Sequence, residues 1–209
     1  MAGGNGATRL NPQELNPRER MVRTAAQLIR TKGVSGTGLR EVVEAAAAPR
    51  GSLQHYFPEG KDQLVSEALL WMGSVAARRV DRVLSKLAAP SPSALLAGTV
   101  DLWRKEFVTL GFAGGCPLVA AAADVAATSD ELRGVIARAF EGWVEPMTGA
   151  LIQTGVPEER AGTLATLVIS ALEGAIILSR IRRDTGPLDA VEKELAPLLD
   201  AAVPRDRRG

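Results

Sequence analysis

The sequence predicts an all-α protein of about nine helices, with a small N-terminal domain and a larger C-terminal one. The 209 residues are 46% hydrophobic but only 4% aromatic, so a core can form and must consist mostly of alanine, leucine and valine. Apolar residues recur at the spacing of three and four that places them on one face of a helix. Alternating β-branched runs and Asn-Gly hairpin signals, which would predict strands, are not found in the sequence.

The chain is expected to open with a disordered arm and a first helix. Residues 1–15 are mostly glycine, alanine and polar residues, a composition typical of disorder. Asn16 can cap a helix, Pro17 suits the first helical position and Gly33 can end the helix. The apolar stripe of this helix consists of Met21, Val22, Ala25, Leu28 and Ile29.

The stretch from Leu39 to Tyr56 predicts two short helices joined by a tight turn. The first covers residues 39–46, the turn is Ala47-Ala48-Pro49, and the second covers residues 50–56. The second helix is too short to be stable alone, so Leu53 and Phe57 must pack onto neighbouring helices. A short, braced helix with a polar outer face is what a helix-turn-helix presents to the DNA major groove.

The run Gly51-Ser52-Leu53-Gln54-His55-Tyr56-Phe57, followed by Lys61, resembles the DNA-binding motif of TetR-family transcriptional regulators. The runs 57–61 (FPEGK) and 115–118 (GCPL) are most similar to the LmrA/YxaF-like branch. Three positions depart from the family pattern: Gln54 replaces a tyrosine, Ala47 replaces the turn glycine and Pro49 replaces a capping serine or threonine. If Ala47 has a positive φ, it carries strain of roughly 1 kcal/mol.

The resemblance implies DNA contacts along the second short helix and at its two neighbours. Gln54 is the sharpest candidate for base reading, since its amide can pair bidentately with adenine. Lys61 opposes the positive end of its own helix, a conflict that a bound phosphate would resolve. The expected DNA-binding residues are Thr37 (phosphate contact or helix cap only), Arg50 (guanine or phosphate), Gly51 (close approach to DNA or to the first helix), Ser52, Gln54, His55, Tyr56 and Lys61.

The rest of the chain predicts six longer helices. A break at residues 89–93 and a flexible glycine loop at residues 111–115 separate the first three of them, and Pro146 is a candidate kink. The predicted ranges are 61–87, 94–110, 116–127, 130–153, 156–183 and 188–203. We therefore expect an arm (1–15), a helix-turn-helix DNA-binding domain (16–60), a ligand-binding and dimerisation domain (61–203) and a tail (204–209).

Residues 161–179 are almost entirely apolar or small and must be weighed as a membrane span. The length of 19 residues is close to the ~20 that a bilayer requires, but Glu173 lies inside the segment. A helix buried on most sides is favoured, and it needs a partner because a surface helix cannot be apolar all round. With the last helix it is expected to form a four-helix dimer interface, as the resemblance implies, and no membrane association is expected.

The same resemblance implies a ligand pocket in the C-terminal domain, suited to a flat, hydrophobic small molecule. Plain core packing is the competing interpretation for each aromatic or methionine side chain. Glu173 needs a partner if buried, either Arg104, Lys105 or Arg180, or a polar group of the ligand. The candidate ligand-binding residues are Trp71, Trp103, Phe107, Cys116 (a core thiol or an oxidant sensor), Phe140, Trp143, Met147, Glu173 and Ile177.

Composition narrows the remaining function classes. A single cysteine and a single histidine exclude an intramolecular disulfide, a cysteine-based zinc site and histidine-rich metal chemistry, so no metal or cofactor is expected. The first residues lack the apolar core of a signal peptide, which predicts a cytoplasmic protein. The net charge is +1, but residues 1–63 hold nine basic and six acidic side chains, a mild positive bias at the motif.

These observations favour a homodimeric, ligand-responsive repressor that binds a pseudo-palindromic operator in double-stranded DNA. In the LmrA/YxaF-like branch, the resemblance suggests, regulated genes often encode exporters of drugs or plant-type aromatic compounds. One alternative is an α-helical enzyme with a pocket around Glu173, although no nucleophile motif accompanies it. The other is a dimeric ligand-binding protein whose DNA motif has decayed, which the departures at Gln54 and Ala47 keep open.

Overall fold

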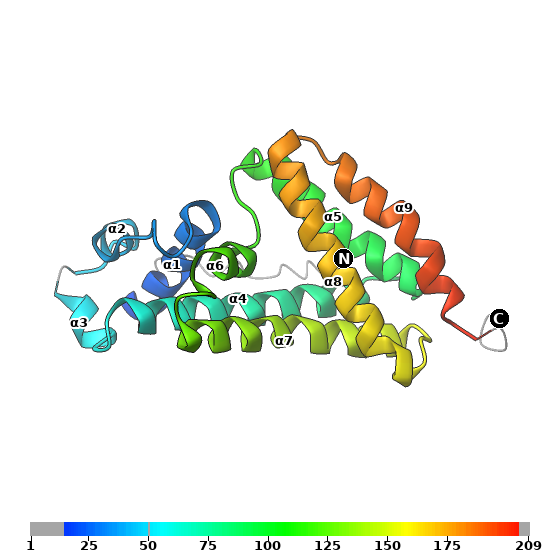
Figure 1. Cartoon of the computed structure of the whole chain (residues 1–209), viewed down its shortest axis with the longest axis horizontal. Helices are drawn as coiled ribbons and strands as arrows, with labels where there is room; N and C mark the ends of the chain where they lie inside the picture. The colour runs from blue at the N-terminus through cyan, green and yellow to red at the C-terminus, as the bar shows by residue number, and fades with distance from the viewer. Residues whose placement is uncertain (1–14, 50, 205–209) are drawn as a thin grey trace, which may run out of the picture.

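A computed structural model of the chain describes residues 15–49 and 51–204. Across those residues the chain forms nine α-helices and no strand, which confirms the all-α prediction (Figure 1). The helices are α1 (Pro17–Lys32), α2 (Leu39–Ala45), α3 (Ser52–Tyr56), α4 (Lys61–Leu84), α5 (Pro92–Leu110), α6 (Pro117–Val125), α7 (Asp130–Gln153), α8 (Glu158–Arg182) and α9 (Gly186–Ala201).

Helix boundaries follow the capping residues of the sequence. The Asn16 side chain accepts a hydrogen bond from the Glu19 amide at 2.9 Å, and Gly33, with φ of 73°, ends α1. The start of α5 is two residues earlier than predicted because Ser91 caps it, accepting from the Ala94 amide at 3.1 Å. Proline is tolerated at the first helical position, so Pro92 belongs to α5 and not to the break before it.

The long helices α4 and α7 lie side by side along the long axis of the molecule and form its spine (Figure 1). Gly73 of α4 lies against the backbone of α7, where an added Cβ would stand 2.6 Å from the carbonyl oxygen of Ala139. Helices α1 to α3 occupy one end of the spine, while α5, α8 and α9 pack over the other half. The α7 helix continues through Pro146 to Gln153.

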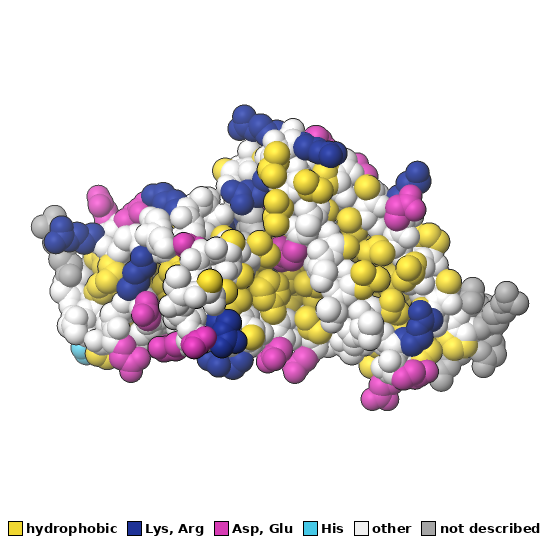
Figure 2. All heavy atoms as spheres, in the orientation of Figure 1, with side chains coloured by type: hydrophobic (Ala, Val, Ile, Leu, Met, Phe, Trp, Pro, Cys, Tyr) yellow, Lys and Arg dark blue, Asp and Glu magenta, His cyan; other side chains and the backbone are white. Residues whose placement is uncertain are grey.

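Helices α8 and α9 leave apolar side chains exposed, and Figure 2 shows hydrophobic atoms gathered over both helices. By length and composition α8 is the one helix in the described part of the chain that could span a membrane. Half of its most apolar window is nevertheless buried within the structure. The exposed large hydrophobic residues here are Leu167, Ile177, Leu178 and Ile181 of α8 and Leu198 of α9.

Candidate functional site

Helix α3 is held in place by one buried ring and by arginines of α1. The Phe57 side chain, directly after α3, is fully buried, and the Arg18 guanidinium lies 5.4 Å from the centre of its ring. Arg20 donates to the carbonyl oxygens of Ala46 at 2.9 Å and Ala47 at 3.1 Å, which fixes the turn that follows α2. A helix of five residues that could not persist alone is thereby given one orientation.

The outer face of α3 presents polar groups to solvent. Gln54 and His55 are exposed, and Tyr56 is half-buried with its ring 4.9 Å from that of His55. The Gln54 amide donates to the Pro58 carbonyl oxygen at 3.3 Å, a long hydrogen bond that a base edge can replace. The Ser52 hydroxyl donates to the Pro49 carbonyl oxygen at 2.7 Å, so a phosphate contact requires it to rotate.

The other predicted DNA contacts have different environments. Lys61 is the first residue of α4, beside the unpaired amide groups of that helix terminus. Thr37 is only 3% exposed and donates its hydroxyl to the Gly33 carbonyl oxygen at 2.7 Å, and the residue that caps α2 is Gly38. The Thr37 hydroxyl therefore stabilises the turn between α1 and α2. Gly51 is exposed at the start of α3, and Arg50 lies outside the described residues.

Ala47 has a φ of 48°, in the left-handed region that alanine disfavours. Replacing Ala47 with glycine is expected to stabilise the protein by about 1 kcal/mol, because glycine adopts this conformation without steric strain. Ala48→Gly at the next position, where φ is not positive, is the matched control and is expected to destabilise. Urea unfolding of both variants checks this, and a loss of stability in Ala47→Gly would contradict it.

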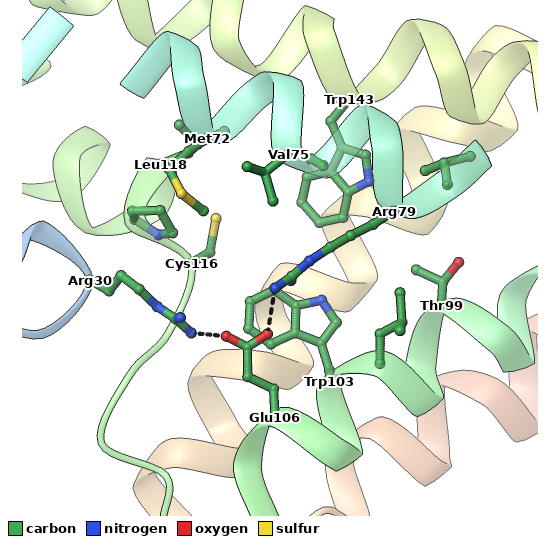
Figure 3. Close-up of a pocket in the computed structure, with 14 residues that line it drawn as sticks. Arg30, Met72, Val75, Arg79, Thr99, Trp103, Glu106, Cys116, Leu118 and Trp143 are labelled. Atoms are coloured by element: carbon green, nitrogen blue, oxygen red, sulfur yellow. Dashed lines mark ion pairs between the residues drawn. The ribbon is translucent and has the colours of Figure 1, made fainter. Parts of the chain in front are cut away.

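A second site is a pocket, partly open to solvent, that lies between α1, α4, α5, the start of α6 and α7 (Figure 3). The enclosed space is about 580 Å³ when the part that merges with solvent is included, and the narrow interior cavity is about 40 Å³. The lining residues are Arg30, Met72, Val75, Ala76, Arg79, Val80, Thr99, Leu102, Trp103, Glu106, Cys116, Pro117, Leu118 and Trp143.

Three charged side chains meet on one wall of this otherwise apolar pocket. Glu106 of α5 forms ion pairs with Arg30 of α1 and with Arg79 of α4, the latter at 2.9 Å (Figure 3). The Arg30 Nε also donates to the Gly115 carbonyl oxygen at 3.0 Å, and the Arg79 guanidinium lies 5.8 Å from the Trp103 ring centre. One carboxylate thus ties together three helices from separate parts of the chain.

Comparison with known proteins identifies the family. The family model described as bacterial regulatory proteins, tetR family, matches residues 22–68, and that of the LmrA/YxaF-like regulator C-terminal domain matches residues 92–194. Rv0196 of Mycobacterium tuberculosis, named an uncharacterised HTH-type transcriptional regulator, is 40% identical over 197 residues, covering 92% of this chain and 98% of Rv0196. The chain belongs to the TetR family.

Further relatives agree with this TetR-family assignment. YxaF of Bacillus subtilis is 30% identical over 182 residues (87% of this chain, 94% of YxaF), and DhaR of a Mycobacterium species, named a transcriptional repressor, is 27% identical over 195 residues (90% and 92%). A crystal structure of a TetR regulatory protein from Rhodobacter sphaeroides has the same fold, with a TM-score of 0.76 at 20% identity, covering 87% and 97% of the two chains. The TetR family consists of DNA-binding transcriptional regulators, so the enzymatic alternative is excluded.

In this TetR-family chain the pocket contains three of the residues singled out from sequence: Trp103, Cys116 and Trp143. The other six lie elsewhere in the structure. Trp71 faces α1, where the Arg23 guanidinium is 5.4 Å from its ring, and the Phe107 ring stacks on Phe112 at 4.9 Å. Met147 is buried in the core, and Phe140 is partly buried against the core. Ile177 of α8 is 42% exposed, and Glu173 is buried but does not line the pocket.

The three charged residues of the pocket are among those that sequence analysis missed. Arg30 sits at the end of a helix assigned to the DNA-binding domain, and Arg79 and Glu106 look like ordinary solvent-facing charges on amphipathic helices. No local pattern connects them, because the cluster forms only when α1, α4 and α5 pack together. The loop at residues 111–115, expected to be flexible, is anchored at two carbonyl oxygens, by Arg30 at Gly115 and by Arg180 at Ala113 (3.2 Å).

Glu173 does not find the basic partner predicted for it. Arg104 instead binds Asp101, Asp189 and Glu192, Arg180 donates to the Ala113 carbonyl oxygen, and Lys105 is exposed. Both Glu173 carboxylate oxygens are buried with no nitrogen or oxygen donor bound to them among the described residues, and the neighbouring polar group is the Cys116 thiol.

This burial raises the pKa of Glu173 to about 7, an effect that the neighbouring Cys116 thiol partly opposes. Burial, together with the Glu173 charge, also raises the pKa of the Cys116 thiol well above its ordinary value. The thiol therefore stays protonated and poorly nucleophilic, which favours the core interpretation of Cys116 over that of an oxidant sensor.

Proposed function

We propose that this TetR-family regulator is a cytoplasmic homodimeric repressor, released from a pseudo-palindromic operator by a small aromatic ligand. The observation that carries the proposal is the course of α4. Its first residue, Lys61, adjoins the recognition helix, and its middle turns supply Met72, Val75 and Arg79 to the pocket. A ligand that prefers one position of α4 changes the spacing of the two recognition helices, and it weakens operator binding by its differential affinity for the two states.

Repression is the direction favoured by relatives, since DhaR and also NemR of Escherichia coli are named transcriptional repressors. Base reading is assigned to Gln54, phosphate contacts are assigned to Ser52, His55, Tyr56 and Lys61, and Arg50 is assigned to either guanine or phosphate. The exposure of Gln54 and His55 on α3 and the position of Lys61 at a helix N-terminus support this division.

Two substitutions separate base reading from phosphate contact. Lys61→Ala is expected to weaken binding to all DNA sequences alike and, because each dimer loses two lysines, to reduce the slope of log affinity against log salt by about two. Gln54→Ala is expected to cost about 1–3 kcal/mol per half-site of the operator and to relax sequence preference at one position in each half-site. Fluorescence anisotropy across a salt series measures both effects.

The matched control for these substitutions is Lys86→Ala, at the exposed residue just beyond the opposite end of α4. If Lys61→Ala behaves like Lys86→Ala, the proposed phosphate contact is wrong. If neither the wild-type protein nor any variant prefers operator over random DNA, the repressor function is wrong. The alternative of a dimeric ligand-binding protein with a decayed DNA motif then replaces it.

The dimer is assigned to α8 and α9, because their apolar side chains stay exposed in one chain. Burying such a surface explains why α8 is apolar enough for a membrane while half of its most apolar window packs inside the protein. Leu178→Glu, at a residue 45% exposed, is expected to convert the dimer to monomer in sedimentation equilibrium. Val108→Glu, at a residue of α5 that is 80% exposed and belongs to neither α8 nor α9, is expected to remain dimeric. A dimeric Leu178→Glu variant would place the interface elsewhere.

A further inference from the structure

The charged wall of the pocket holds more positive than negative charge. Its charged lining residues, within the described ranges, are Arg30, Arg79 and Glu106, so two guanidinium groups share one carboxylate. Arg30 is only 6% exposed and Glu106 only 13%, so water compensates the charge of Arg30 poorly, whereas Arg79 is 32% exposed. The rest of the wall is apolar and includes two tryptophan rings.

Each arginine is positioned so that it can serve another anion. Arg30 is anchored through its Nε to the Gly115 carbonyl oxygen, which leaves its terminal nitrogens directed at Glu106 (Figure 3). Arg79 is steadied over the Trp103 ring and contacts Glu106 through one terminal nitrogen. Guanidinium groups bind planar carboxylates and related oxyanions more tightly than they bind neutral acceptors.

We infer that the pocket takes an aromatic ligand bearing an acidic oxygen group, whose anionic end binds Arg30 and Arg79 in competition with Glu106. The ring system of the ligand lies among Trp103, Trp143 and Met72. This inference rests on the proposed function and specifies its ligand class. A neutral aromatic compound of the same shape leaves the positive charge uncompensated and binds more weakly.

The same competition gives the ligand its effect on DNA binding. Arg30 belongs to α1, which braces the recognition helix, and Glu106 belongs to α5 in the other domain. An anion that displaces Glu106 breaks the ion pair between α1 and α5 and draws Arg79 of α4 toward the ligand. The helix-turn-helix is then released from one of its attachments to the C-terminal domain, and the operator-bound arrangement loses stability.

Direct binding of two matched probes tests the inference without DNA. 2-Naphthoate and its neutral isostere 2-naphthamide are titrated into purified protein, and quenching of tryptophan fluorescence is recorded. We expect the acid to bind at least about tenfold more tightly than the amide. Arg79→Gln, at a residue 32% exposed and therefore tolerant of substitution, is expected to abolish most of this preference for the acid over the amide.

A second variant distinguishes loss of the anion site from a general packing defect, because it is expected to strengthen binding. Glu106→Gln removes the competing carboxylate, so naphthoate binding is expected to strengthen about tenfold and naphthoate is expected to raise the Tm of this variant more than that of wild type. If Glu106→Gln does not fold, Arg79→Gln alone decides the question. Equal affinity for acid and amide, including no measurable binding of either, or an unchanged preference in Arg79→Gln, would overturn the inference.

The DNA arm of the experiment separates this inference from the proposed function. With an operator fragment, naphthoate is expected to lower the affinity of wild type and to have a much smaller effect on Arg79→Gln. Acid preference in the probe titration without any operator binding would overturn the repressor function and leave the ligand class standing. Operator binding with no acid preference would overturn the ligand class alone.

Discussion

Replacing Gly73 with alanine is expected to destabilise the protein by about 1–3 kcal/mol, although the change adds a single methyl group. A Cβ at this position would stand 2.6 Å from the Ala139 carbonyl oxygen and 3.1 Å from the Ala139 Cα. Both atoms are backbone, so no side chain can turn aside and α4 must move away from α7. The variant is therefore expected to lose stability and to alter the pocket wall that α4 supplies.

Gly142→Ala on α7 is the matched control for this substitution. The atoms nearest to an added Cβ there are 3.7–3.8 Å away, in ordinary van der Waals contact with Gly73 itself. Because alanine favours a helix interior over glycine, Gly142→Ala is expected to stabilise by about 0.5–1 kcal/mol. Urea unfolding at one protein concentration compares the two variants. Equal effects of the same sign would contradict the close approach of α4 and α7 at Gly73.

Glu173→Gln is expected to stabilise the protein at pH 8 by about 1–3 kcal/mol and to change it little at pH 5. The pKa of Glu173 is raised from 4.5 to about 7 by burial, so the folded state binds a proton there more tightly than the unfolded state. Stability from this group is therefore greatest below pH 4.5, falls as the pH rises toward 7, and is level above that. Glutamine cannot ionise and removes this dependence.

Unfolding of wild type and Glu173→Gln from pH 5 to pH 8 measures the effect. Glu194→Gln on α9, where the side chain is 76% exposed, is the control and is expected to match wild type at both pH values. A parallel pH dependence in wild type and Glu173→Gln would show that the Glu173 carboxyl does not titrate in this range.

Local signals in the sequence predicted the elements of the fold well. Capping by Asn16 and termination by Gly33 depend on neighbouring residues only, and both are as predicted. The strain at Ala47 could also be predicted from sequence. The family pattern has a glycine at this turn position, which indicates a positive φ, and alanine disfavours that conformation. Ser91 and Pro92 were placed in a break because a proline pair resembles a linker as much as a helix start.

The candidate site was less predictable, because its features arise from contacts between distant helices. The cluster of Arg30, Arg79 and Glu106 needs three helices to meet, and each residue alone looks like a surface charge. Glu173 was recognised as anomalous, but its lack of a basic partner depends on Arg104 being engaged by α9. Periodicity identified the helices that carry Trp103 and Trp143 and could not show which aromatic side chains share a cavity.

The central claim is that this TetR-family chain binds its own regulatory DNA in a sequence-specific manner through α3 and Lys61. The most direct test is fluorescence anisotropy of the wild-type protein with the DNA that flanks its gene, against a scrambled fragment, from about 50 to about 200 mM salt. We expect binding that exceeds the scrambled fragment by about a thousandfold or more and weakens steeply with salt. Equal affinity for the two fragments at every salt concentration, extended by genome-wide fragment selection that recovers no preferred sequence, would contradict the claim.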